Sequence, residues 1–599
     1  MPSYKAPVED TLFLLYDVLG FERHANLPGF ADASRDVVEA VLRETAKLAE
    51  DAFQPVNRTG DLQGCVRADD SSVATPNGFK AAYDAFAEGG WIGLSADPEY
   101  GGQGLPHTLA AIVNEYVSAA NMALAMYPGL TQGAIAALTL HGADALKRTY
   151  LPKMIAGEWT GTMNLTEPHC GTDLGLIKTK AVPNGDGSYR ITGTKIFISA
   201  GEHDLTENIV HLVLARIEGA PEGTKGISLF VVPKLLVNPD GSLGARNPVS
   251  CGSLEHKMGI HGNATCVMNY DGAIGWLVGV EHRGLPAMFT MMNEARLGVG
   301  IQGLAQSEVA YQNAAAYAKD RRQGRALTGP QDATKPADPI IVHPDVRRTL
   351  LSIKAFNEAA RALILWTSLK GDVGHASDDP KDKQTGDDLM GLLTPVIKGV
   401  ITDVGFDNAV KAQQMFGGHG YVAEWGMEQF VRDARIAMIY EGANGVQAMD
   451  LVGRKLGRDG GRAIMALFKE IDGFLAANAA DDDDGMKPFL DPLKKARGDL
   501  QSATMWFMAN AMAKPDNAGA GATDFMHLMG LTALGYMWAK IARAALDRKA
   551  SGAVDAAAMD VKLTTGRFFM ERCLPETGAR LAAISAGADT VMALPAEAF

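Results

Sequence analysis

The sequence predicts a multidomain α+β protein whose parts follow one another in the order helical, β, helical, helical. Helical periodicity runs through the first 160 residues, short alternating strands with glycine-rich turns follow, and helical periodicity then returns. The chain has 599 residues, whereas single hydrophobic cores stop growing at about 250–300 residues. We therefore expect an N-terminal helical domain at residues 1–160, a middle β domain at 161–285, a helical bundle at 286–455 and an additional helical domain at 456–599.

The first two parts differ in the spacing of their apolar residues. Residues 36–53, DVVEAVLRETAKLAEDAF, place apolar side chains at intervals of three and four, which predicts an amphipathic helix. Glycines and a proline within residues 97–104 predict a loop. In residues 189–199 and 226–234, YRITGTKIFIS and GISLFVVPK, the pattern changes to that of strands, and Asp186-Gly187 before the first predicts a turn.

The later parts return to helical periodicity, from about Ala287 to the region of Arg321 and then across residues 345–370 and 390–416. The proline-containing stretch 326–344 and the polar stretch 371–388 are predicted to be loops. A further helical block follows residue 456 and is interrupted by a run of four aspartates, Asp481 to Asp484. We interpret this run as a solvated loop, because like charges repel one another unless ligands come from elsewhere.

Composition and charge exclude several classes of protein. The chain is 47% hydrophobic and 21% charged, as in ordinary soluble proteins, and its net charge of −14 argues against general nucleic-acid binding. Its five cysteines are scattered and no pair has the spacing of zinc ligands, so we expect no metal site and a reducing compartment. We find no signal peptide and no run near the ~20 apolar residues of a membrane helix. A soluble cytoplasmic protein without a membrane partner is expected.

Two motifs belong to the predicted β domain. Residues 163–173, MNLTEPHCGTD, offer a threonine hydroxyl, backbone amides and a tight turn that could bind a flat polar ring system. An ordinary turn between a helix and a strand explains this segment equally well. Residues 257–272, KMGIHGNATCVMNYDG, enter a strand after a glycine-rich turn, and alone they indicate structure only.

Three further motifs lie in the predicted bundle. Residues 317–325, YAKDRRQGR, end a long helix with cations, which the helix dipole favours and solvation alone explains. Residues 414–421, QMFGGHGY, place glycines where a backbone could approach a phosphate or ring, although a helix C-cap is the alternative. In residues 433–447, DARIAMIYEGANGVQ, Glu441 follows an apolar stretch. Burial there would raise its pKa and suit a general base, whereas a lone glutamate in a loop is ordinarily exposed.

Taken together and in this order, the motifs TEPHCGTD, KMG, RRQG, QMFGGHGY and IYEG resemble those of the acyl-CoA dehydrogenase family over roughly residues 85–455. The resemblance implies the fold of that family, with a helical domain, a β domain and a helical bundle, here followed by an extra helical domain. It also implies FAD-dependent oxidation of an acyl-CoA thioester to the trans-2-enoyl-CoA. Glu441 matches the catalytic base of the family.

The same resemblance assigns roles to other residues. Four positions match those around the flavin of the same subunit, namely Leu165, Thr166, Phe197 and Ser199. Five match positions that reach the FAD of a neighbouring subunit, namely Arg321, Gln323, Gln414, Gly417 and Gly418. Four are expected to contact the acyl-CoA substrate, namely Thr172, Arg296, Tyr440 and Gly442.

The sequence departs from the family pattern at several places. Phe197 stands where tryptophan is frequent, and the usual phenylalanine between Gln323 and Gly324 is missing. After Glu441, Ala443 and Gly445 replace the polar pair of short- and medium-chain enzymes, which puts adenine contacts there in doubt.

The family also offers a second position for the base, on the helix just before Arg296. Some members take their base from this position, which is Ala295 here and cannot abstract a proton. Its neighbour Glu294 lies about 100° round the helix. Glu441 is therefore the predicted base.

The long form, with its extra C-terminal block, is most similar to bacterial dehydrogenases that act on 3-(methylthio)propanoyl-CoA in sulfur-compound degradation. Medium- or long-chain fatty acyl-CoA oxidation is the alternative. The resemblance further implies electron-transfer flavoprotein as the electron acceptor and a homodimer. A DNA-associated branch of the family uses a basic C-terminal region, which the 15 Lys/Arg against 17 Asp/Glu in residues 461–599 oppose.

Overall fold

The computed structural model describes residues 2–479, 485–552 and 555–599, so the aspartate run at 481–484 lies outside the described residues. The chain forms two compact units. Unit 1 consists of Met1–Ala40 and Val299–Phe599, and unit 2 is Val41–Gly298. The boundaries predicted for the four domains stay a prediction, because each compact unit combines parts of several of them.

Unit 2 begins with helices and continues into strands, in the predicted order. Helix α2 starts at Arg35 and crosses into unit 2, where the amphipathic pattern of residues 36–53 indeed forms helix. The helices are α2 (Arg35–Leu48), α3 (Gln54–Gln63), α4 (Phe79–Glu88), α5 (His107–His141) and α6 (Asp144–Ile155). The strands are β1 (Val66–Arg67), β2 (Val73–Ala74), β3 (Trp159–Asn164), β4 (Lys180–Pro183), β5 (Ser188–Ser199), β6 (Asn208–Ile217), β7 (Ile227–Pro233), β8 (Leu235–Val237), β9 (Leu243–Arg246), β10 (Val249–Leu254) and β11 (Thr265–Val278).

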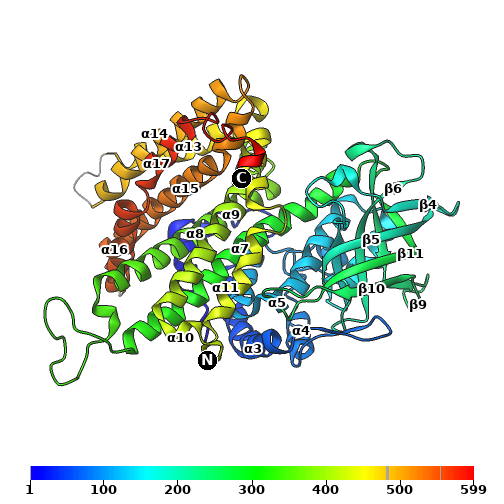
Figure 1. The fold of residues 1–599 in the computed structure, drawn as a ribbon, viewed down its shortest axis with the longest axis horizontal. Coiled ribbons are helices and arrows are strands. Elements are labelled where there is room, and N and C mark those ends of the chain that lie inside the picture. Colours follow the sequence, from blue (N-terminus) through cyan, green and yellow to red (C-terminus); the bar gives the residue numbers. More distant parts are fainter. Residues whose placement is uncertain (1, 480–484, 553–554) are drawn as a thin grey trace. The chain divides into compact units, whose positions relative to one another are not determined.

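Seven strands of unit 2 form one sheet, in which six follow the order β10-β11-β5-β4-β6-β3. Figure 1 shows β10, β11, β5 and β4 among them. Strand β7 pairs with both β11 and β6, which closes the path β11-β5-β4-β6-β7 into a ring. The predicted turn at Asp186-Gly187 joins β4 to β5, and Gly187 has φ +90°, a value that favours glycine. The inward side chains are apolar and buried, including Ile191, Val213 and Phe230.

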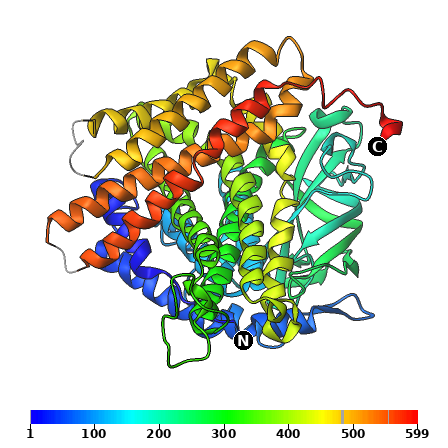
Figure 2. The same cartoon turned by 60° about the vertical axis from the view of Figure 1, so that its left-hand side comes forward.

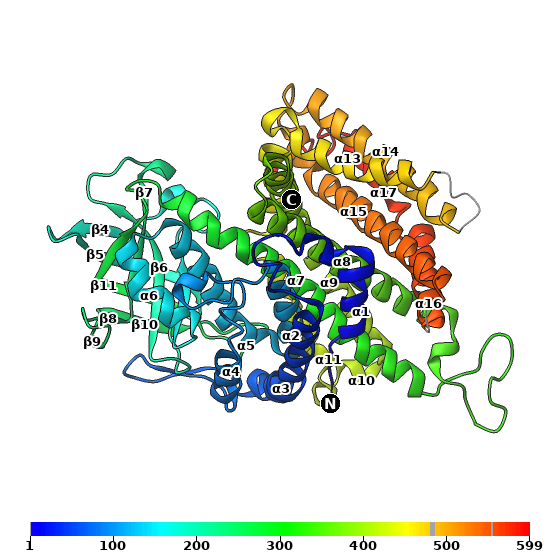
Figure 3. The same ribbon diagram turned by 180° about the vertical axis from the view of Figure 1, so that it is seen from behind.

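Unit 1 is helical, as Figures 2 and 3 show for its long, closely packed helices. Helix α7 starts in unit 2 and ends in unit 1. The helices are α1 (Val8–Phe13), α7 (Gly284–Asp320), α8 (Pro344–Ala376), α9 (Pro380–Met415), α10 (Gly418–Tyr421), α11 (Met427–Arg435), α12 (Asn444–Asp450), α13 (Arg462–Ala477), α14 (Lys487–Asn510), α15 (Asp516–Ala550), α16 (Ala556–Arg572) and α17 (Glu576–Ser585). Within the C-terminal block, α15 packs against α14, α16 and α17, and it also contacts α8, α9 and α12.

One predicted loop is wrong and another is confirmed. The polar stretch 371–388 is almost entirely helical, because α8 continues to Ala376 and α9 begins at Pro380. Its glycines serve helix packing: a Cβ on Gly374 would come within 3.1 Å of the Cα of Gly386. The stretch 326–344 is a loop with one short 3-10 turn, organised around the buried carboxylate of Asp338, which accepts hydrogen bonds from three backbone N–H groups.

The N-terminal segment is bound along α7 by side-chain amides. Asn313 Oδ1 accepts from the backbone N–H of Ser3 at 3.0 Å, and its Nδ2 donates to the Ser3 carbonyl at 2.8 Å. Gln312 makes the same pair of contacts with the backbone of Lys5, at 2.9 and 2.8 Å. These amides therefore pair with an extended chain as a neighbouring strand would.

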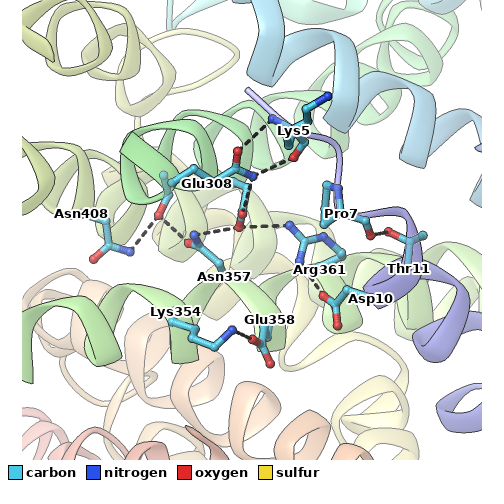
Figure 4. Close-up of polar contacts among 12 residues, drawn as sticks. Lys5, Pro7, Asp10, Thr11, Glu308, Lys354, Asn357, Glu358, Arg361 and Asn408 are labelled. Atoms are coloured by element: carbon cyan, nitrogen blue, oxygen red, sulfur yellow. Dashed lines mark hydrogen bonds and ion pairs between the residues drawn. The ribbon is translucent and has the colours of Figure 1, made fainter. Parts of the chain in front are cut away.

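A buried charge network then fastens the N-terminal segment to the helices of unit 1 (Figure 4). Arg361, on α8, donates to Asp10 at 2.9 Å and to Glu308, on α7, at 3.2 Å. Lys562, on α16, pairs with Asp10 and with Glu358. Burial raises the pKa of Asp10, but Lys562 and Arg361 outweigh burial and hold that pKa at about 2. The network thus joins the start of the chain to its C-terminal block.

Two helices are long and apolar enough to cross a membrane by length and composition alone, although no such run was expected. They are α5 (His107–His141) and α9 (Pro380–Met415). The most apolar windows of these helices are 94% and 72% buried inside the protein. Core helices of soluble proteins pass the same test, so these two helices are weak support for a membrane span.

Candidate functional site

The structure brings the predicted flavin-binding loop of unit 2 against the end of strand β5. Leu165 and Thr166 follow directly after β3. The carbonyl of Thr166 accepts a hydrogen bond from the backbone N–H of Ile196 at 2.9 Å. Ser199 ends β5 and pairs with Thr265 of β11. Four residues that the sequence assigned to one cofactor therefore lie on two adjacent segments.

A buried ion pair holds this loop in place. Lys195, on β5, is fully buried and donates to Glu167 Oε1 and to the Leu165 carbonyl, both at 2.9 Å. Glu167 also accepts hydrogen bonds from the Thr179 hydroxyl and from two backbone N–H groups. Burial raises the pKa of Glu167, but Lys195 and these hydrogen bonds outweigh burial and lower it below the usual value. Both charges are paired, as buried charges must be.

Phe197 combines two uncommon features at the end of β5. Its φ is +60°, in the left-handed region that bulky residues rarely adopt. Its side chain is 60% exposed, although the ring is apolar. Strained backbone and an exposed aromatic ring together are typical of ligand-binding positions. Phe197 therefore fits one face of a flat ring system such as isoalloxazine.

Glu167, His169 and Cys170 place possible metal-ligand atoms within 4.8 Å of one another. The oxygens of Glu167 are already used by Lys195, Thr179 and backbone N–H groups. The Nε2 atom of His169 lies 2.9 Å from the Leu176 carbonyl. Glu167 and His169 therefore already have hydrogen-bond partners within the protein, and the expectation of no metal site stays a prediction.

Glu441 lies in unit 1, in a short loop between a 3-10 turn and α12. Its φ is +56°, so it shares with Phe197 the left-handed conformation that non-glycine residues rarely adopt. Gln447 Nε2 donates to the Glu441 carbonyl at 3.0 Å and to the Gly442 carbonyl at 3.2 Å. Lys398 Nζ donates to the same Gly442 carbonyl at 2.8 Å. The surroundings therefore hold the backbone of this loop in a strained shape.

Tyr440, just before Glu441, is turned into the helical unit. Its hydroxyl donates to Gln302 Oε1, on α7. Burial raises the pKa of Tyr440 above its usual value, and the Glu441 carboxylate raises it further. The tyrosine is therefore a neutral hydrogen-bonding group at physiological pH.

The residues predicted to reach the FAD of a neighbouring subunit gather at the end of α7. Arg321 and Gln323 follow that helix and are exposed. The glycine turn after α9 is held close to them, because the Tyr317 ring stacks on Phe416 at 4.1 Å and its hydroxyl lies 2.9 Å from His419 Nδ1.

The glycines of this turn leave the backbone accessible. A Cβ added to Gly417 or Gly418 would meet nothing within 4 Å. Gln414, at the last turn of α9, is exposed as well. The turn thus presents open backbone and polar side chains, as a phosphate or ring ligand requires.

The two remaining substrate-contact candidates lie in unit 2. Thr172 is exposed in the loop after β3, and Arg296 is 8% exposed on α7. On the same helix Ala295 is half-buried and Glu294 is exposed. Ala295 has no side-chain group that could act as a base, and the Glu294 side chain is exposed to solvent.

Several residues were missed by sequence reasoning. Glu167 lies inside the motif TEPHCGTD and Lys195 lies inside the predicted strand 189–199, but neither carried a predicted role. Lys398 had a visible signal, since it is a lone cation in the apolar stretch LLTPVIKGVIT, and it is fully buried. Long-range partners of this kind have no signature in one sequence.

The chain matches four family profiles in succession. Residues 38–158, 162–273 and 282–456 match the N-terminal, middle and C-terminal domains of acyl-CoA dehydrogenase, respectively. Residues 467–595 match the family described as "Acetyl-CoA dehydrogenase C-terminal like". The extra helical block is therefore a family module of its own.

Two curated relatives match almost end to end. "3-Methylmercaptopropionyl-CoA dehydrogenase" of Ruegeria pomeroyi is 41% identical over 98% of this chain and 99% of its own length. "Broad-specificity linear acyl-CoA dehydrogenase FadE5" of Mycobacterium tuberculosis is 35% identical over 96% of both chains.

A solved structure shares the same fold. ACDH-11 of Caenorhabditis elegans, in complex with C11-CoA, has a TM-score of 0.76 at 21% identity and covers 96% of this chain and 92% of its own. The order of the domains, the likeness of this structure and the full-length relatives agree with one another. The chain belongs to the acyl-CoA dehydrogenase family of flavin-dependent oxidoreductases.

Proposed function

We propose that the protein oxidises short acyl-CoA thioesters, and 3-(methylthio)propanoyl-CoA in particular, with FAD as its cofactor and Glu441 as its base. The substrate assignment rests on the 41% identity to the Ruegeria pomeroyi enzyme, which extends over 98% of the chain and includes the C-terminal block. The M. tuberculosis relative, at 35% identity, favours a second candidate function, the oxidation of linear acyl-CoA thioesters over a broader range of chain lengths.

The chemistry assigned to Glu441 follows from the acidity of the substrate. The α-proton of a thioester is weakly acidic, so removing it requires a positioned base and stabilisation of the enolate oxygen. In this proposal the Glu441 carboxylate takes the proton, and the backbone N–H of Glu441 donates to the thioester oxygen. Because Glu441 is held at φ +56°, its carboxylate and its backbone N–H keep a fixed orientation relative to each other. FAD, when bound, supplies the acceptor for the hydride that leaves the β-carbon.

The cofactor is assigned to residues whose surroundings fit it. In unit 2, Leu165, Thr166 and Ser199 supply backbone and hydroxyl groups beside the exposed ring of Phe197. Thr172, Arg296, Tyr440 and Gly442 remain the proposed substrate contacts. The protein thereby orients the reactants, and the redox chemistry belongs to the cofactor.

We also propose a homodimer and electron-transfer flavoprotein as the electron acceptor. In the single chain, the side chains of Arg321, Gln323 and Gln414 are exposed. Groups that bind the cofactor of another subunit have to be exposed before that subunit is present. Tyr421, next to the glycine turn, is 88% exposed, and Leu327 is 86% exposed. Large apolar side chains left in water at this end of α7 favour burial against a second copy. A cytoplasmic location also stays a prediction.

A panel of acyl-CoA substrates tests the chain-length proposal. We expect kcat/KM to be highest for 3-(methylthio)propanoyl-CoA and for four- and five-carbon chains, and to fall at twelve and sixteen carbons. The thioether sulfur replaces a methylene, and an apolar pocket separates such neighbours by only about 1–3 kcal/mol. A maximum of kcat/KM at twelve carbons or beyond would contradict the short-chain proposal and favour fatty-acid oxidation. The proposed roles of the flavin and Glu441 would be unchanged.

The DNA-associated branch finds no support in the C-terminal block. Its helices carry cations that are mostly paired within the protein, for example Arg497 with Asp472 at 2.7 Å and Arg580 with Asp524 at 2.7 Å. A phosphate backbone would need cations that are available for binding. A DNA-binding assay at varied salt would therefore show only weak association.

A further inference from the structure

We infer that the C-terminal block positions the catalytic loop through a continuous chain of hydrogen bonds, in which His527, Asp403, Asn444 and Lys398 are positioning residues. This inference rests on the proposed role of Glu441 and gives the added domain a part in that reaction. All four residues and the loop belong to unit 1, which the structure describes as one compact body.

The chain of hydrogen bonds begins at the loop that contains Glu441. Lys398, on α9, is fully buried, and its Nζ donates to the Gly442 carbonyl at 2.8 Å and to Asn444 Oδ1 at 2.7 Å. Gly442 is the residue after Glu441, so this cation binds the backbone one residue beyond the proposed base. A buried ammonium group is costly to desolvate unless it is hydrogen-bonded, which explains why the two carbonyl oxygens are drawn toward it.

Asn444 is the branch point. It is the first residue of α12. Its Nδ2 lies within hydrogen-bonding distance of Gly399 O at 3.1 Å, Thr402 Oγ1 at 2.9 Å and Asp403 Oδ1 at 2.6 Å. The side chain of Asn444 thereby connects the turn that follows Glu441 to two successive turns of α9.

The last step reaches the added domain. Asp403 Oδ2 lies 2.9 Å from Nε2 of His527, on α15. An ionised carboxylate only accepts hydrogen bonds, so Nε2 of His527 is the donor. Helix α15 packs on α9 and on α12, and Figure 1 shows it beside the long helices of the bundle. The contact is mostly shielded from water, since the His527 and Asp403 side chains are 13% and 22% exposed.

The consequence for catalysis comes from strain. A left-handed Glu441 persists only while its neighbours hold it there. Gln447 holds the loop locally, whereas Lys398 and Asn444 connect it to α9 and, through Asp403, to α15. Misplacing a reacting group by about 1 Å can cost about 10²-fold in rate even when the change is remote. The network should therefore affect the rate of proton abstraction more than the affinity for acyl-CoA.

The experiment compares substitutions at His527 in the full-length protein with FAD bound. We expect His527→Leu to slow anaerobic flavin reduction by butanoyl-CoA about 10-fold, because leucine cannot donate to Asp403. His527→Gln keeps a donor at similar reach and should restore the rate to within about 3-fold of wild type. FAD content, melting temperature and the apparent Kd for the thioester should change little. Lys398→Met, nearer the loop, should slow reduction by about 10²-fold.

The matched control is Asp524→Asn, one turn earlier on α15, which removes the charge that pairs with Arg580 and leaves the four residues of the hydrogen-bond chain unchanged. Its flavin reduction should equal that of wild type. Equal losses in His527→Leu and in the control, or in His527→Leu and His527→Gln, would overturn the inference, as would a normal rate in His527→Leu. If Lys398→Met does not fold, the two His527 variants decide. Wild-type flavin that no acyl-CoA reduces would instead refute the proposed function.

Discussion

Replacing Glu441 with glutamine should slow reduction of the flavin by acyl-CoA by about 10²–10⁴-fold, because a positioned general base is worth about that much. Glutamine keeps the size and hydrogen-bonding reach of the side chain but cannot accept the α-proton. The backbone contacts from Gln447 and Lys398 do not involve the altered group, so the loop should keep its shape. Stopped-flow measurement of flavin absorbance, together with the FAD content of the variant, checks this expectation.

Glu294→Gln is the matched control for this experiment. Glu294 has the same charge as Glu441 and is exposed on α7, next to Ala295, the alternative base position considered above. We expect that variant to reduce its flavin at the wild-type rate. A fast Glu441→Gln enzyme with a slow Glu294→Gln enzyme would move the base to α7.

The second large effect concerns the stability of unit 1. Arg361→Met should lower the free energy of unfolding by about 3–5 kcal/mol, because removing one partner of a buried charge network leaves the others uncompensated. The Arg361 side chain is 2% exposed, and methionine fills similar space without replacing its bonds to Asp10 and Glu308. Thermal unfolding monitored by circular dichroism measures the loss. Arg567→Met on α16, where both partners are more than half exposed, should cost no more than about 1 kcal/mol.

The pH dependence of this network has a definite sign. The pKa of Asp10 is about 2, below its ordinary 3.8. A depressed carboxyl pKa stabilises the fold above the unfolded value and loses that contribution as pH falls through the folded value. The difference of nearly two units corresponds to about 2 kcal/mol. The gap between wild type and Arg361→Met should therefore narrow between about pH 4 and pH 2, and a gap that is unchanged there would contradict this account.

The architecture was predictable because its signals are local. Periodicity in residues 36–53 and alternation in residues 189–199 report the face that each element buries, and both became the expected helix and strand. The stretch 371–388 was predicted wrongly because its polar residues and glycines look like a loop. Gly374 and Gly386 instead allow two helices to approach closely, and such a contact depends on a partner far along the chain.

The site was predictable only in part, for a related reason. Glu441 and Phe197 lie within short recognisable motifs, and their left-handed backbones agree with functional positions. The support for these residues is dispersed: Lys398 and His527 act on one loop from helices more than one hundred residues apart in sequence. A lone lysine in an apolar helix hints at burial, but it does not reveal which carbonyl it binds.

Anaerobic titration of the purified protein tests most directly whether this chain uses FAD to oxidise acyl-CoA thioesters. We expect a yellow protein with non-covalent FAD whose visible absorbance is bleached by 3-(methylthio)propanoyl-CoA or butanoyl-CoA, with a trans-2-enoyl-CoA as the product. A protein that takes up no FAD on reconstitution, or a bound flavin that stays oxidised with every acyl-CoA from four to sixteen carbons, would contradict it.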